Sequence, residues 1–122
     1  MPSGYNMNTC SYMQLLRGKV EKRKLPIDED TAEQIAWAFQ GLGDATRIKL
    51  IAALIEGESN VTDLAELVGV SQSGVSHQLR VLRNLRFVST SREGQQIFYR
   101  IDDEHITDLY KLAYAHSGHQ VT

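Results

Sequence analysis

Glycine interrupts the apolar helical pattern in the centre of the sequence, and the short segments that result limit the folds open to the chain. One helical pattern begins at Asp44 and ends at Gly57, and the next begins near Val61 and ends at Gly69. A third pattern follows Ser71, which is a favourable N-cap residue. The gap between the second and third segments is about as long as the turn of a helix-turn-helix. The spacing therefore predicts this motif.

The sequence after the third segment changes its period. Residues 87–91 and 96–101 are rich in β-forming residues, and residues 92–95 between them supply a hairpin turn with a glycine. Asp102 or Asp103 is suited to cap a last helix. These elements together predict a mainly α fold with a small β-hairpin, which is a winged helix-turn-helix. The apolar side of the last helix is expected to contain Ile106, Leu109, Tyr110 and Ala113.

Pro26 marks a boundary between a tail and the folded part. Residues 1–25 lack sustained periodicity and are expected to form a flexible N-terminal tail. Residues 26–119 are expected to form the winged helix-turn-helix domain, followed by a short C-terminal tail, residues 120–122. The domain is expected to open with a helix whose apolar residues are Ala32, Ile35, Ala36, Phe39 and Leu42 and which Gly41 and Gly43 end.

The composition of the 122 residues excludes several classes of protein. No apolar run approaches the roughly 18 residues of a membrane span, and the polar N-terminus does not resemble a secretory signal. Cys10 is the single cysteine, so an internal disulfide and every multi-cysteine zinc motif are excluded. The expected compartment is the cytoplasm.

Basic residues gather in one region although the formal net charge is −2. Residues 71–100 contain one acidic residue, Glu93, and five arginines. A local positive surface of this kind is what a protein needs to bind the phosphate backbone of DNA. The arginines are Arg80, Arg83, Arg86, Arg92 and Arg100.

The helix that follows Ser71 is the expected DNA-reading element. Short polar side chains at its start allow close approach to a groove, and Gln72 has the donors and acceptors that read adenine. Arg80 has the length to reach a phosphate or a guanine, whereas His77 fits either a DNA contact or an ordinary position on the helix. The predicted DNA-binding residues are Gln72, Ser73, Ser76, His77 and Arg80 in this helix and Arg92 and Gln95 in the wing.

Potential metal ligands occur at both ends of the last helix. His105 and His116 lie 11 residues apart, which is almost three helical turns, so both lie on one face. The same spacing separates them by about 16 Å, and one straight helix cannot bring both to a single ion. Two antiparallel copies can, so the geometry requires a homodimer with two equivalent sites. Three imidazoles and one carboxylate suit tetrahedral Zn(II), with Co(II) as a close substitute, through Asp103, His105, His116 and His119.

Several motifs in the right order resemble the ArsR/SmtB family of bacterial metal-responsive repressors. They are Leu42-Gly43-Asp44-Ala45-Thr46-Arg47, residues 70–80, Leu82-Arg83-Asn84-Leu85 and the second wing strand with Tyr99. The resemblance covers about residues 32–119. It implies a homodimeric winged-helix repressor that releases its operator DNA when an inducer binds.

The resemblance also bears on the choice of metal. In zinc-sensing members the last helix contains Asp-x-His, ten residues, then His-x-x-His or His-x-x-Glu, and the four potential ligands occupy those positions. Other members have a Cys-x-Cys motif at a stretch that is Asn60-Val61-Thr62-Asp63-Leu64 here, so that soft-metal site is not expected. In close relatives the ligand equivalent to His116 bonds to the backbone carbonyl equivalent to His77, which implies allosteric coupling through these two residues.

The ligand set and the resemblance together imply a repressor that binds operator DNA as a homodimer and is released by Zn(II), or by Co(II). The resemblance implies that it controls genes for metal efflux or sequestration. A nickel or cobalt sensor of the same family is one alternative, although residues 1–24 contain no histidine to complete an octahedral site. A metal-independent winged-helix DNA-binding module is another. Enzymatic activity is not expected, because four protein ligands leave no open position on zinc and no nucleophile–base pair appears elsewhere.

Overall fold

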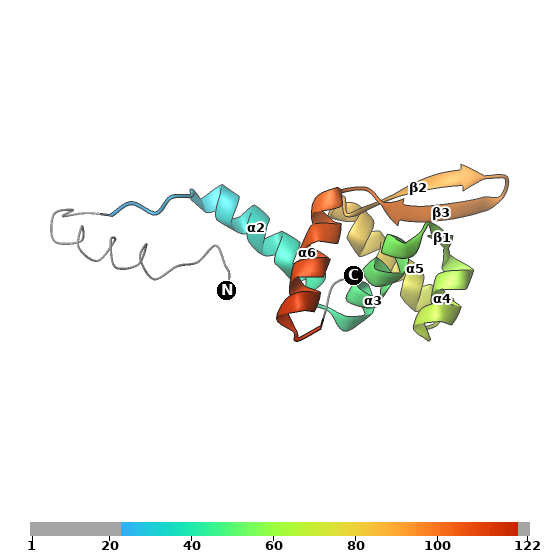
Figure 1. Cartoon of the computed structure of the whole chain (residues 1–122). Helices are drawn as coiled ribbons and strands as arrows, with labels where there is room; N and C mark the ends of the chain where they lie inside the picture. Colours follow the sequence, from blue (N-terminus) through green and yellow to red (C-terminus); the bar gives the residue numbers. More distant parts are fainter. Residues whose placement is uncertain (1–22, 120–122) are drawn as a thin grey trace. The chain divides into compact units, whose positions relative to one another are not determined.

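The computed structural model describes residues 23–119, and these form helices with one small sheet (Figure 1). Cys10, most of the predicted N-terminal tail and residues 120–122 lie outside the described residues. The chain divides into two units, residues 1–32 and 33–122, and the first turn of α2 belongs to the first of them. The elements are α2 (Glu29–Leu42), α3 (Ala45–Glu56), β1 (Ser59–Asn60), α4 (Val61–Val68), α5 (Gln72–Asn84), β2 (Val88–Glu93), β3 (Gln96–Ile101) and α6 (Glu104–His116).

The predicted boundaries of α3, α4 and α5 are confirmed, and local capping interactions fix them. Gly41, which was predicted to help end the first helix, instead lies inside α2. The Asp44 carboxylate accepts from the backbone N–H of Arg47 at 3.1 Å at the start of α3. Ser71 Oγ accepts from the backbone N–H of Gly74 at 3.1 Å at the start of α5. Gly69 ends α4 in the left-handed region, with φ 82°. The tight connection between α4 and α5 therefore forms the predicted helix-turn-helix.

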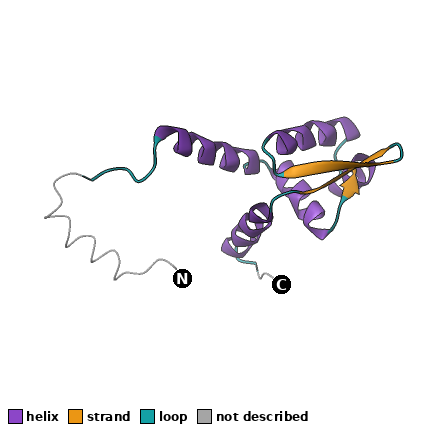
Figure 2. Cartoon of the chain, turned by 90° about the horizontal axis from the view of Figure 1, so that it is seen from above, coloured by secondary structure: helices purple, strands orange, loops and turns teal. Residues whose placement is uncertain are grey.

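The sheet is larger than the sequence predicted. The hairpin is present, but β2 continues through Glu93, so Gly94 and Gln95 alone make the turn, with Gly94 at φ 64°. A third strand, β1, pairs antiparallel with β3, so the strand order is β1-β3-β2. Figures 1 and 2 show the hairpin turn at the end of the sheet that is farther from α6. The predicted four-residue turn was wrong because a glycine with positive φ allows a tighter two-residue turn.

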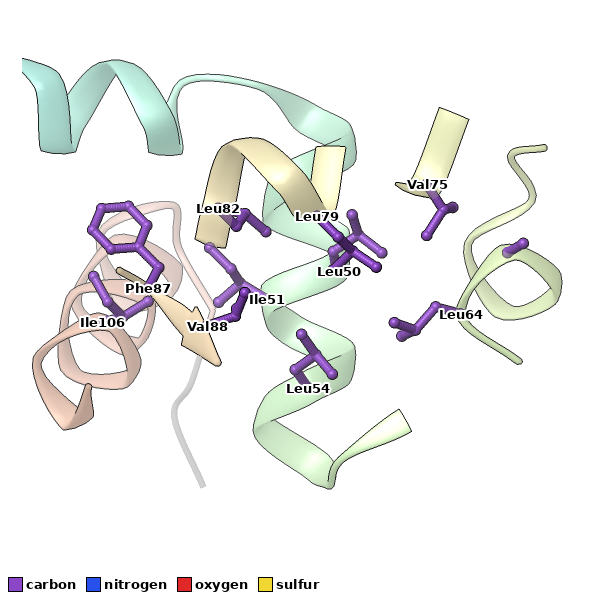
Figure 3. Close-up of a cluster of buried hydrophobic side chains, with 11 residues drawn as sticks. Leu50, Ile51, Leu54, Leu64, Val75, Leu79, Leu82, Phe87, Val88 and Ile106 are labelled. Atoms are coloured by element: carbon purple, nitrogen blue, oxygen red, sulfur yellow. The ribbon is translucent and has the colours of Figure 1, made fainter. Parts of the chain in front are cut away.

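The core joins α3, α4, α5, β2 and α6 within residues 33–119 (Figure 3). Each helix contributes one apolar face, as the spacing of the apolar residues requires. This packing holds α5 and the β2–β3 hairpin on one scaffold. The buried side chains are Leu50, Ile51, Leu54, Leu64, Ala65, Val75, Leu79, Leu82, Phe87, Val88 and Ile106.

Two helices keep apolar residues on the surface. Phe39 of α2 is 59% exposed, the neighbouring Trp37 is 63% exposed, and Leu112 of α6 is 68% exposed. Ala113, which was expected on the apolar side of α6, is also exposed. The helical periodicity predicted both helices correctly, but it did not show whether their apolar residues pack within one chain. No helix in the described part of the chain is long and apolar enough to cross a membrane.

Candidate DNA interface and metal ligands

The exposed face of α5 carries the residues predicted to read DNA. Gln72, Ser73, His77 and Arg80 are exposed and Ser76 is half-buried. The opposite face is anchored in the core, because Val75, Leu79 and Leu82 have no exposed surface. The helix thus presents one polar face on a fixed apolar base, which is the arrangement of a recognition helix.

The N-terminal end of α5 is ordered by the serines that precede and follow its first residue. Ser71 Oγ caps the helix through Gly74 and also lies 3.3 Å from Ser73 Oγ, within hydrogen-bond distance. A side-chain Cβ at position 74 would approach Val70 and Ser71 too closely, so glycine allows the turn to pack on the helix. Free backbone N–H groups and hydroxyls at a helix N-terminus are suited to phosphate contact.

The predicted wing contacts lie on the hairpin. Arg92 pairs with Ile97 near the end of β2, and Gln95 is in the turn. Both side chains belong to exposed residues. The predicted DNA-binding residues therefore come from two elements, α5 and the β2–β3 hairpin, and their contact with DNA stays a prediction.

The first pair of potential metal ligands meets at the start of α6. Asp103 is the N-cap, and its Oδ1 lies 2.9 Å from the backbone N and 2.7 Å from Nδ1 of His105. The backbone N–H of His105 donates to the carboxylate and lowers the pKa of Asp103 below its usual value, and the imidazole contributes to the same effect. Both side chains are open to solvent, with 43% and 87% exposed for Asp103 and His105. The pair is thus accessible to an ion.

The second pair lies at the other end of α6. His116 is the last residue of the helix and is exposed. His119 follows after a short turn, and its imidazole stacks on Tyr114 with ring centroids 4.8 Å apart at an interplanar angle of 34°. Tyr114 in turn stacks on Tyr110 at 5.9 Å. These contacts hold His119 close to the helix end.

One copy of the chain does not bring the two pairs together. Within residues 23–119, no group of three or more His, Cys, Asp or Glu side chains is arranged to hold a metal ion. This agrees with the separation of about 16 Å along α6 that the helical rise gives for His105 and His116. The described residues also include no hydrogen bond between His116 and the His77 backbone, so that coupling stays a prediction. The donor chemistry of three imidazoles and a carboxylate fits Zn(II) or Co(II).

Comparison with known proteins relates α3, the helix-turn-helix and the start of β2 to a family. Residues 44–90 match the family described as "Bacterial regulatory protein, arsR family". The HTH-type transcriptional regulator NmtR of Mycobacterium tuberculosis is 45% identical over 94 residues, which are 77% of this chain and 78% of NmtR. The chain belongs to the arsR family of bacterial regulatory proteins. It is therefore related to transcriptional regulators rather than to enzymes.

Two further comparisons support membership of the arsR family. A Staphylococcus aureus homologue of the cadmium resistance transcriptional regulatory protein CadC is 33% identical over 108 residues, 88% of this chain and 89% of the homologue. The solution structure of apo-NmtR matches with a TM-score of 0.66 at 42% identity, over 83% of this chain and 85% of NmtR. The order of elements, in which the β2–β3 hairpin follows α4 and α5, confirms the predicted winged helix-turn-helix, and this likeness agrees with it.

Proposed function

We propose that this arsR-family chain is a transcriptional repressor that binds operator DNA as a homodimer and releases it on binding Zn(II), with Co(II) as an alternative inducer. The observation that carries the metal assignment is the placement of two exposed ligand pairs at opposite ends of α6, Asp103 with His105 and His116 with His119. Each pair alone offers two ligands, whereas a stable tetrahedral site needs four.

A homodimer supplies the missing half of each site. If the α6 helices of two copies run antiparallel, the start of one helix meets the end of the other and two equivalent sites form. The exposed apolar residues on α2 and α6 support this assembly, because apolar patches of this kind are commonly buried between subunits. They include Trp37, Phe39 and Leu112, which are all more than half exposed in the single chain.

The roles of the four side chains follow from their places on α6. Asp103 and His105 are held together before any ion is present, so they form a preorganised half-site. His116 ends α6 and His119 follows three residues later, so both imidazoles belong to the same end of the helix and are assigned to one ion. When bound, Zn(II) would accept electron pairs from these four side chains and hold them in one arrangement. The four ligands leave no position for a catalytic water, which is consistent with a sensor.

Repression itself is assigned to α5 and the wing. We assign base reading to Gln72, Ser73, Ser76 and Arg80 and backbone contacts to Arg92 and Gln95, with His77 at the edge of the same face. Release requires that the metal bind the DNA-free conformation more tightly than the DNA-bound one. The coupling is reciprocal, so operator DNA weakens zinc affinity by the factor by which zinc weakens DNA affinity.

The choice of zinc depends on the ligands and on the residues that are absent from the sequence. The S. aureus homologue is named for cadmium resistance. In this chain residues 60–64 contain no cysteine, and thiolates are the ligands that soft metals prefer. Residues 1–24 contain no histidine, which disfavours a six-coordinate nickel site that draws on them.

The experiment that tests this function follows DNA release during metal titration. Zn(II), Co(II) and Ni(II) are added separately to the metal-free protein bound to a fluorescent duplex that the protein has selected from a random pool. Zn(II) and Co(II) are expected to lower the anisotropy to that of free DNA, and Ni(II) to do so less effectively. The His105→Gln/His119→Gln variant, which lacks one ligand of each pair, is expected to stay bound. Binding that is unaffected by every metal would favour the metal-independent module, and release by Ni(II) alone would favour the nickel sensor.

A further inference from the structure

The guanidinium group of Arg47, in the first turn of α3, connects two other helices. Its Nε donates to the carbonyl of Gly41 at 2.6 Å and its Nη2 to the carbonyl of Gln40 at 3.2 Å, both at the C-terminal end of α2. Its Nη1 donates to Oε1 of Gln78, in the middle of α5, at 2.8 Å. One half-buried cation thus joins α2, α3 and α5.

The end of α2 needs a cationic donor from elsewhere. The last carbonyls of a helix lack partners within it and carry partial negative charge, and α2 has no basic residue in its last turn. Arg47 supplies both the charge and the donors. Gly41 is buried, and a Cβ at this position would overlap Cδ1 of Leu85 at the end of α5. The C-terminal end of α2 is therefore held against α5 at two points, Gly41 with Leu85 and Arg47 with Gln78.

Gln78 lies on the side of α5 away from the DNA-reading face. Each residue turns an α-helix by about 100°, which places Gln78 roughly 140–160° around the helix from Ser73 and Arg80. Its side chain is half-buried and engaged by Arg47. A hydrogen bond on this side restrains the rotation of α5 about its own axis and leaves the exposed face free.

We propose that Arg47 is a positioning residue for DNA recognition, which acts through Gln78 to hold α5 at the rotation that its base-reading side chains require. The proposal rests on the assignment of α5 as the recognition helix. Hydrogen bonds to base edges weaken steeply with poor geometry, whereas general attraction to phosphates is tolerant of small rotations. Loss of the Arg47–Gln78 bond is therefore expected to lower sequence-selective affinity more than non-selective affinity.

The test compares two labelled duplexes by fluorescence anisotropy with the full-length chain. One is the duplex that the unaltered protein selects from a random pool, and the other is a scrambled duplex of the same composition. Gln78→Leu removes the acceptor but keeps both bonds from Arg47 to α2. It is expected to reduce affinity for the selected duplex about tenfold and for the scrambled duplex less than about twofold. Gln78→Glu keeps an acceptor for Arg47 and is expected to retain the parent ratio of the two affinities.

Two further variants separate positioning from direct contact. Arg47→Met and the double variant Arg47→Met/Gln78→Leu are expected to lower the ratio by the same factor as Gln78→Leu, because all three lose the Arg47–Gln78 bond to which the proposal attributes the selectivity. Arg47→Met also loses the two bonds to α2, so it additionally tests whether those bonds matter. Lys49→Met removes an exposed cation from the same helix and is expected to keep the parent ratio. Circular dichroism checks that each variant is folded. If Arg47→Met does not fold, Gln78→Leu alone tests the proposal.

Two results would overturn the positioning role of Arg47 but leave the assignment of α5 to DNA reading intact. One is a folded Gln78→Leu variant whose ratio of affinities for the selected and scrambled duplexes equals that of the parent. The other is a double variant whose losses add, which would mean that Gln78 contacts the DNA itself. An unaltered protein that selects no duplex would instead overturn the assignment of α5 to DNA reading.

Discussion

Nδ1 of His105 lies 2.7 Å from Oδ1 of Asp103, so the two ligands assigned to one half of the metal site face each other before an ion is bound. In a tetrahedral zinc site with zinc–ligand distances near 2 Å, neighbouring ligand atoms are about 3.3 Å apart. A small separation of the two side chains is therefore enough to admit the ion. The same Asp103 oxygen caps α6 through the His105 N–H at 2.9 Å, so the ligand and the helix cap are one side chain.

The double role of Asp103 leads to a spectroscopic prediction. Co(II) is expected to give the intense visible bands of a tetrahedral site at about one ion per protomer. Asp103→Asn keeps a good capping residue but loses the anionic ligand, so it should retain the helical content of α6 and weaken Co(II) binding by more than about tenfold. Visible absorption gives the coordination and circular dichroism gives the helix content. A weak octahedral spectrum in the parent would contradict the ligand set.

The contact of His119 with Tyr114 predicts that Tyr114, which is not a metal ligand, lowers zinc affinity. Aromatic pairs contribute about 0.5–1.5 kcal/mol, and coordination that turns the His119 imidazole away from Tyr114 loses this energy. Tyr114→Ala should therefore raise zinc affinity up to about tenfold in a chelator competition assay. Tyr114→Phe keeps the ring and is the matched control, for which parent affinity is expected. If Tyr114→Ala binds zinc more weakly in an intact dimer, the stack supports the ligand geometry instead.

Arg80 is expected to contribute directly to DNA binding. It is exposed on α5, about 100° around the helix from the buried Leu79 side chain. Arg80→Ala should weaken binding to the selected duplex by about 1–3 kcal/mol if it makes a base contact or a charged phosphate contact. Lys111→Ala removes one exposed positive charge from α6 and should change binding little. Anisotropy titrations at several salt concentrations measure both variants, and unchanged affinity for folded, dimeric Arg80→Ala would mean that the reading face is misplaced.

The parts of the fold that depend on local interactions were predictable from the sequence. Asp44 and Ser71 cap helices by bonding to backbone groups three residues ahead, and Gly69 ends a helix through its own φ angle. Such features leave a signal within a few residues. Strand β1 leaves almost none, because it is two residues long and exists only through its pairing with β3.

The long-range features of the site were not predictable in the same way. Arg47 and Gln78 are 31 residues apart, so no local pattern links them, although Arg47 belongs to a motif that the sequence singled out. The exposure of Trp37 and Leu112 depends on which surfaces remain after the core has formed. The ligand spacing on α6 was readable because helical rise converts sequence separation into distance. The pairing of the two half-sites depends on a second copy of the chain. The sequence gives only the geometric requirement that the α6 helices of the two copies run antiparallel.

Metal binding and DNA release are separable properties. We expect substitution of His116 to impair DNA release more than it impairs metal binding. It ends α6 on the helix face shared with Leu109 and Leu112, and the family resemblance links its second ring nitrogen to the His77 carbonyl. His116→Gln keeps a polar group at the site but loses that link. We predict that this variant binds the selected duplex normally and is poorly released by saturating zinc. An ion that binds both conformations equally well does not shift the equilibrium between them.

His119→Gln is the matched comparison for His116→Gln. It lies beyond the end of α6, so its loss should lower zinc affinity while each bound ion still weakens DNA binding nearly as much as in the parent. Anisotropy of the labelled duplex, with and without saturating zinc, measures the coupling, and chelator competition measures the affinity. Since the coupling free energy is the same whichever ligand is added first, zinc affinity measured with and without DNA must give the same ranking. Complete release of His116→Gln by zinc would exclude this route from metal to DNA even if the four ligands are correct.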